Sequence, residues 1–122
     1  MNRLLAKLSL AAVLVAIAGS VPMTVSAHPS MDITASNWKF IPRTITLHVG
    51  ETTQLRLTST EGVHGIKSEA LGIPLTTIQP GKFVTVDVTP RKAGTYVLHC
   101  EIICGPGHAK MALTVVVLAA SN

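Results

Sequence analysis

The sequence predicts an all-β fold, a Greek-key β-sandwich or barrel that follows an N-terminal export signal. After residue 27, polar and apolar residues alternate with a period of two in six short segments. Turn-forming residues separate these segments, and none of the chain after residue 27 shows extended helical periodicity. Short alternating strands at this spacing are typical of Greek-key sandwiches and barrels.

The first 27 residues have the features of a secretory signal peptide. Two basic residues precede an apolar run, and Val25-Ser26-Ala27 has the small-x-small pattern of a cleavage site. The apolar run is short for a membrane span, which needs about 20 residues. We therefore predict a signal peptide over residues 1–27 and one mature domain over residues 28–122. The location would be periplasmic or secreted, with no membrane contact unless the signal is retained as an anchor.

The first half of the mature domain contains three predicted strands, at residues 31–36, 43–49 and 53–58, each with clear alternation. Ile41-Pro42 separates the first strand from the second, and Gly50 separates the second from the third. Proline and glycine at these points favour turns.

The second half contains three more predicted strands, at residues 82–89, 95–100 and 110–118. Pro80-Gly81 precedes the first of them, and Ala93-Gly94 precedes the second. Because side chains alternate across a strand, Cys100 shares the core face with Leu98, whereas His99 faces away. In the first half of the domain, Trp38 and Phe40 lie between the strands predicted at residues 31–36 and 43–49, and they are predicted to pack in the sandwich.

Charge and composition argue against nucleic-acid binding. The chain carries ten basic and six acidic residues, a net charge of +4. Removal of the predicted signal takes two basic residues with it, so the mature domain would carry +2. The remaining basic residues are scattered, and aromatic residues that could stack on bases make up 3% of the chain.

The most specific feature is the segment from Cys100 to Met111, which has the pattern C-x-x-x-C-x-x-x-H-x-x-M and contains both cysteines of the chain. Thiolate, imidazole and thioether groups are ligands that copper prefers over hard cations. Upstream, His64 lies where a strand is expected to end and offers a second imidazole. The sequence therefore predicts a copper site, with two copper ions per chain.

The predicted loop explains how these ligands come together. Cys100 ends a core strand, so the following residues 101–109 form a loop over the rim of the sandwich. Gly105, Pro106 and Gly107 allow a tight turn that returns Cys104 to the first cysteine. A rigid site on strand ends suits electron transfer, because its geometry changes little between oxidation states.

Together with Trp38-Lys39-Phe40 and Gly94-Thr95-Tyr96, this segment and His64 resemble the CuA domain of cytochrome c oxidase subunit II and of nitrous oxide reductase, within the cupredoxin family. The resemblance extends over most of residues 31–118. It implies that two cysteine sulfurs bridge two copper ions and that each histidine binds one of them. A methionine and a backbone carbonyl would be weak ligands. The implied metal ligands are His64, Cys100, Ile102 (through its carbonyl), Cys104, His108 and Met111.

One position departs from the family pattern. Oxidase subunit II usually has glutamate two residues after the first cysteine, where it helps to bind a metal at the interface with the catalytic subunit. This chain has Ile102 there, with Glu101 one residue earlier. The copper site would survive, but a free-standing exported electron carrier fits this sequence better than an oxidase subunit. Its partner would be a redox protein such as a cytochrome or an oxidase.

Several alternatives remain open at this point. A mononuclear blue-type site would use one cysteine, two histidines and a methionine, but would leave the second cysteine unexplained. A periplasmic protein for copper storage or delivery, or a small oxidase subunit II-like subunit, would also contain such ligands. In the metal-free protein, Cys100 and Cys104 could form a disulfide. We predict no catalytic residues, because no nucleophile–base or paired-carboxylate pattern is evident.

Overall fold

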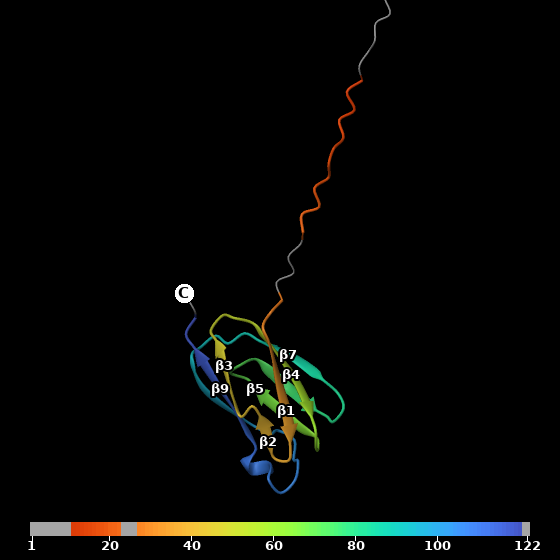
Figure 1. The fold of residues 1–122 in the computed structure, drawn as a ribbon. Coiled ribbons are helices and arrows are strands. Elements are labelled where there is room, and N and C mark those ends of the chain that lie inside the picture. Colours follow the sequence, from red (N-terminus) through yellow and green to blue (C-terminus); the bar gives the residue numbers. More distant parts are fainter. Residues whose placement is uncertain (1–10, 23–26, 121–122) are drawn as a thin grey trace, which may run out of the picture.

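The computed structural model describes residues 11–22 and 27–120, so most of the predicted signal peptide and its cleavage pattern lie outside the described residues. Residues 11–22 form no helix or strand and are exposed. The described residues form β-strands and one short 3-10 helix (Figure 1). These elements are β1 (Ser30–Ser36), β2 (Lys39–Ile41), β3 (Thr44–His48), β4 (Thr53–Ser59), β5 (His64–Ser68), β6 (Ile73–Ile78), β7 (Val84–Val88), β8 (Gly94–His99), η1 (His108–Lys110) and β9 (Ala112–Leu118). Across the described residues, no helix is both long and apolar enough to cross a membrane.

The strands form a sandwich, which confirms the predicted all-β fold. One sheet has the order β2-β1-β4-β7 and the other has the order β3-β9-β8. The β1–β4 and β3–β9 pairs are parallel, whereas β4–β7 and β8–β9 are antiparallel. The β5–β6 hairpin forms a third sheet that lies beside β8 and β7.

Alternating apolar side chains of the two main sheets form the core. In β4, Leu55 and Leu57 point inward, and in β9, Leu113 and Val115 do so; all four are completely buried. Phe40 of β2 is also completely buried, as predicted, and it packs in the same cluster. Removal of this apolar surface from water is the main stabilising contribution to the fold.

All six predicted strands are present, with ends that shift by up to a few residues. The last of them was predicted to begin at Lys110, which is wrong, because residues 108–110 form η1 and the strand begins at Ala112. The prediction also missed β2, β5 and β6. A bulge between Ile66 and Ser68 interrupts the alternation of β5, and Pro74 interrupts the pattern of β6.

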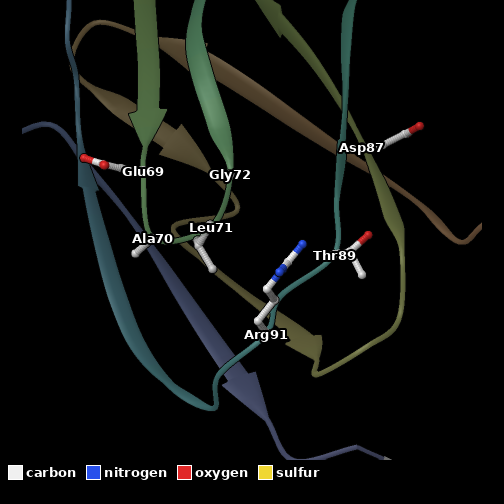
Figure 2. A pocket seen from close by; sticks show the side chains of 7 residues that line it. All are labelled: Glu69, Ala70, Leu71, Gly72, Asp87, Thr89 and Arg91. Carbon is white, nitrogen blue, oxygen red and sulfur yellow. The ribbon is translucent and has the colours of Figure 1, made fainter.

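A polar cavity of about 350 Å³ lies at the turn between β5 and β6. Figure 2 shows that Glu69 and Asp87 point away from each other, while the guanidinium group of Arg91 extends into the space between Leu71 and Thr89. The two carboxylates therefore do not form a catalytic pair. The cavity is lined by neither histidine nor cysteine, and it lies at the opposite end of β5 from His64.

Candidate metal centre

The predicted ligand loop begins directly after β8 and ends directly before β9. At its base, the backbone N–H of Cys100 donates a hydrogen bond to the carbonyl of Met111 at 3.1 Å. This bond extends the antiparallel pairing of β8 with β9 by one step, so both ends of the loop are held by the sheet. The first cysteine and the methionine are therefore anchored by strands, as the sequence predicted for Cys100.

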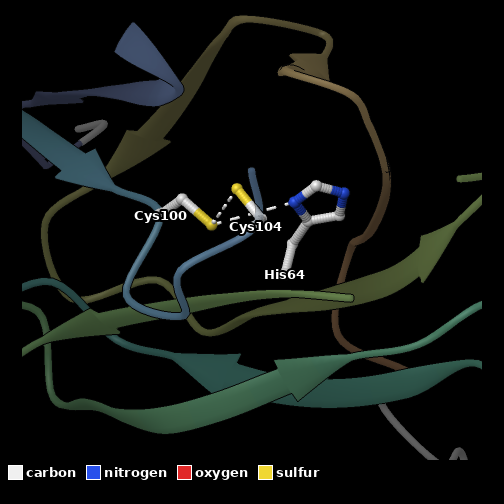
Figure 3. A group of neighbouring side chains, drawn as sticks. All are labelled: His64, Cys100 and Cys104. Carbon is white, nitrogen blue, oxygen red and sulfur yellow. Dashed lines mark hydrogen bonds between the residues drawn. The ribbon is translucent and has the colours of Figure 1, made fainter. Parts of the chain in front are cut away.

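The loop brings the two cysteines together. The sulfur atoms of Cys100 and Cys104 lie 3.4 Å apart, and both cysteines are free thiols (Figure 3). Gly105 has a φ of 121°, a conformation that side-chain-bearing residues rarely adopt, and it turns the chain back immediately after Cys104. The prediction of a tight turn at this position is confirmed.

His64 reaches the first cysteine from the β5–β6 hairpin. It was predicted at the end of a strand, in a loop, which is wrong: it is the first residue of β5 and is completely buried. Its Nδ1 lies 3.8 Å from the sulfur of Cys100. Its Nε2 lies 2.7 Å from the carbonyl oxygen of Glu61. Because a carbonyl oxygen can only accept, Nε2 carries a proton, and in the neutral imidazole Nδ1 then faces the sulfur of Cys100 with its lone pair.

The second cysteine has its own pair of neighbours. The Nδ1 atom of His108 lies 3.5 Å from the sulfur of Cys104, and the thioether sulfur of Met111 lies 3.9 Å from the same atom. Met111 is completely buried. It therefore packs in the core and also faces the site, so its role in packing is compatible with the predicted role as a ligand.

The backbone carbonyl of Ile102 completes the half of the site that contains Cys100. Its oxygen lies 3.2 Å from the Cys100 sulfur. The Ile102 side chain packs over Gly65, where an added Cβ would lie 2.9 Å from Cγ1 of the isoleucine. The position that departs from the family pattern thus uses its side chain to fix its own carbonyl beside the site.

The arrangement fits copper by its donor chemistry. Each sulfur has one imidazole nitrogen and one weaker donor close by, and the two sulfurs are adjacent. The ligand atoms of His64, Cys100 and Cys104 all lie within 4.8 Å of one another. Soft sulfur and imidazole ligands select copper over hard cations such as calcium or magnesium. All six predicted ligands therefore lie together.

The turn between β1 and β2 contacts both halves of this centre, which was not predicted. Asn37 donates from Nδ2 to the carboxylate of Glu61 at 2.6 Å, and Glu61 in turn holds His64 through its carbonyl. Trp38 donates from Nε1 to the carbonyl of Cys104 at 2.9 Å, and its ring lies against Gly107. Trp38 was predicted to pack in the sandwich, but it is 37% exposed and covers the ligand loop instead. Residues so distant in sequence give no local pattern that would reveal this contact.

Partial burial and the neighbouring thiol raise the pKa of Cys104 to about 11. Desolvation is the largest cause, followed by the hydrogen bond to Cys100 and by repulsion from its charge. The thiol is therefore protonated at neutral pH in the metal-free protein. Binding of a metal ion at this sulfur would displace the proton, as is general for thiolate ligands.

The pKa of Cys104 predicts slow alkylation of the reduced, metal-free protein. At pH 8 only a small fraction of Cys104 is thiolate. A thiolate of higher pKa is a stronger nucleophile, but this offsets the small fraction only in part. Iodoacetamide should therefore react with Cys104 about tenfold more slowly in the folded protein than in the urea-unfolded chain. The rate should keep rising between pH 9 and pH 11. Mass spectrometry of the peptide containing Cys104 measures this rate separately from that of Cys100. A plateau near pH 9 would contradict the raised pKa.

The contact between Ile102 and Gly65 predicts a second, steric effect. Gly65→Ala should displace the Ile102 side chain and with it the carbonyl, and so weaken copper binding about tenfold. Gly65→Ala combined with Ile102→Ala should restore most of the binding, because the double variant removes the two isoleucine atoms within 3.0 Å of the added Cβ and leaves only the milder contact with the Thr76 carbonyl at 3.3 Å. Gly72→Ala is unsuitable as a control because of its φ of 67°, whereas Ala70→Ser in the same turn is suitable. Competition with a chromogenic copper chelator measures the affinities. Failure of the double variant to regain affinity would contradict the idea that packing of Ile102 on Gly65 positions the Ile102 carbonyl.

The fold and site together define a small β-sandwich protein with a soft-metal centre at one end. The cupredoxin-like domain family matches residues 9–115, and the chain belongs to this family. Cytochrome c oxidase subunit 2 of Thermus thermophilus is 33% identical over 76 residues, which are 62% of this chain and 56% of that protein. This chain therefore spans little more than half the length of that relative.

Two solved structures show the same fold. The periplasmic domain of subunit II of cytochrome oxidase from Bradyrhizobium japonicum superposes with a TM-score of 0.69, at 18% identity, over 80% of this chain and 88% of that one. Auracyanin A, a blue copper protein from Chloroflexus aurantiacus, superposes with a TM-score of 0.56, also at 18% identity, over 75% of this chain and all of that one. The fold therefore occurs both in a domain of an oxidase subunit and in a blue copper protein.

Proposed function

We propose that this protein is an exported electron carrier with a CuA-like centre that binds two copper ions. The observation that carries this proposal is the pair of adjacent sulfurs, 3.4 Å apart, each with its own imidazole nitrogen. A mononuclear site would need only one of the two cysteines. Two ions that share both sulfurs require two similar sets of donors, and the donors around Cys100 and Cys104 divide into two such sets.

In this proposal, Cys100 and Cys104 would hold both ions, and His64 and His108 would each hold one. Met111 and the carbonyl of Ile102 are the weak ligands. Bound copper supplies reversible one-electron exchange. The chain's contribution is to hold the ligands still: His64 is fixed by the carbonyl of Glu61, and the base of the loop is fixed by the sheet. Ligands that are held in place move little between oxidation states, which lowers the barrier to electron transfer.

The proposed location is the periplasm or the outside of the cell, after cleavage of the signal over residues 1–27. The proposed partners are redox proteins, such as a cytochrome or an oxidase. The resemblance to cytochrome c oxidase subunit 2 supports this general class of partner. The protein itself is proposed to have no catalytic residue, because the six donors leave no open position for a substrate.

Electron paramagnetic resonance of the one-electron-oxidised protein tests the proposal. Two bridging thiolates couple the ions strongly, so we expect hyperfine splitting from two equivalent copper nuclei, a purple colour and reversible cycling in voltammetry. Splitting from one nucleus would establish a mononuclear blue-type carrier instead. Copper uptake without reversible cycling would establish storage or delivery.

A further inference from the structure

A second surface feature lies next to the metal centre. A pocket of about 230 Å³ is formed where β2 and η1 approach each other, and we call it the basic pocket. Three of its five lining residues are cations, and all three are exposed. It is lined by Trp38, Lys39, Arg43, Lys110 and Ala112.

The cations of the basic pocket have no acidic neighbour in it. All six carboxylate residues of the chain lie in the described part, and none of them lines this pocket. Among the described residues the one ion pair is between Arg56 and Asp32. The carboxylate of Glu61 accepts a hydrogen bond from Asn37, the residue before Trp38. Three uncompensated positive charges around one hollow attract anionic groups and raise their local concentration.

The basic pocket shares a wall with the ligand loop. Trp38 lines the pocket and donates its hydrogen bond to the carbonyl of Cys104, while Lys110 directly precedes Met111. The segments that form this wall also expose large apolar side chains: Ile41, two residues after Lys39 in β2, is 51% exposed, and Ile103, next to Cys104 in the ligand loop, is 88% exposed. Apolar and aromatic side chains next to arginine are typical of protein interfaces, whereas a site for a free small anion needs no apolar rim.

We propose that the basic pocket is the docking site for a redox partner protein that presents carboxylates next to its own redox centre. This inference rests on the proposed electron-transfer function and specifies its partner as acidic. Docking at this place brings the partner against the Trp38 side of the ligand loop. Charge complementarity of this kind accelerates encounter and fixes orientation more than it adds affinity.

Binding can be tested without copper, because Trp38 is the chain's one tryptophan and lines the pocket. The reduced, metal-free protein is titrated with an oligoglutamate peptide, with an oligolysine peptide of equal length and with inorganic phosphate, while Trp38 fluorescence is recorded. We expect a saturable change with oligoglutamate, weakened by salt, and none with oligolysine. Phosphate that binds as tightly as oligoglutamate would overturn the protein-docking proposal in favour of a small-anion site.

The chain offers a matched control for charge. The pocket variant replaces Lys39, Arg43 and Lys110 with glutamine. The control variant replaces three exposed cations outside the pocket and loses the same net charge; these are Lys67, Arg91 and Lys92. Oligoglutamate affinity should fall about tenfold in the pocket variant and stay near the wild-type value in the control. Equal losses in both variants would show that net charge, and not the pocket, attracts the peptide.

Electron exchange provides the second readout, with the copper-loaded, reduced protein. Hexacyanoferrate(III) and the cationic tris(phenanthroline)cobalt(III) each accept one electron from it and are reduced to the corresponding iron(II) and cobalt(II) complexes. The pocket variant should slow the reaction with the anionic oxidant about tenfold more than the reaction with the cationic one. Parallel changes for both oxidants would overturn the proposal. If the protein cannot be cycled at all, the proposed function fails, and the peptide titration still decides whether the pocket binds carboxylates.

Discussion

Replacement of Cys104 by serine is expected to lower the copper content from the proposed two ions per chain to one or fewer. The Cys104 sulfur lies within 4 Å of three other donors, Cys100, His108 and Met111, so its loss removes one of the two sulfur atoms that the halves of the centre are proposed to share. A serine hydroxyl is a hard donor and does not replace a thiolate toward copper. Elemental analysis of reconstituted protein measures the content, and paramagnetic resonance shows whether coupling between two nuclei disappears.

His99→Asn is the matched control for this experiment. His99 directly precedes the first cysteine but is exposed on the opposite face of β8, so its loss should leave both ions in place. Cys100→Ser should reproduce the effect of Cys104→Ser. Full copper content in either cysteine variant would contradict the bridged arrangement.

Phe40→Ala is expected to cost about 3–5 kcal/mol of unfolding free energy, because Phe40 is completely buried and its removal leaves a cavity in the core. A domain of this size is stable by only about 5–15 kcal/mol, so the variant would retain a small margin or none. Urea unfolding of the metal-free protein, followed by circular dichroism, measures the change.

Ile41→Ala in the same strand is the control for Phe40→Ala. Its side chain is 51% exposed, and we expect a cost of about 1 kcal/mol or less. Similar costs for the two variants would show that β2 does not pack as described. Because β2 follows the turn of Asn37 and Trp38, loss of its core anchor should also loosen the contacts of that turn with the metal centre.

The sequence allowed the prediction of those parts of the site that depend on local patterns. The spacing of Cys100, Cys104, His108 and Met111 identifies one loop, and alternation in β8 places the first cysteine on the core face. Glycine and proline then predict where that loop turns. These features require only the neighbouring residues.

The remaining features depend on contacts between distant segments. His64 was assigned to the wrong kind of element, because the bulge in β5 hides the alternation that would mark a strand. The hydrogen bond of Trp38 to Cys104 spans 66 residues, and that of Asn37 to Glu61 spans 24. The packing of Ile102 on Gly65 likewise arises only when the hairpin and the ligand loop meet. Such contacts are set by the assembled sandwich.

The uneven distribution of ligands along the chain affects how strongly metal would stabilise the fold. Five of the six proposed ligands lie between Cys100 and Met111, whereas His64 lies 36 residues before the first cysteine. The unfolded polypeptide therefore still contains most of the ligands in one short segment. A metal ion that binds this segment stabilises the unfolded chain as well, so the net stabilisation of the native state is smaller than the native affinity alone would give. His64 lies beside the other ligands only when the β5–β6 hairpin is folded, so it is the side-chain ligand that distinguishes the native state from the unfolded state. Copper could thus be captured by the segment before folding, and closure of the β5–β6 hairpin would then complete the coordination.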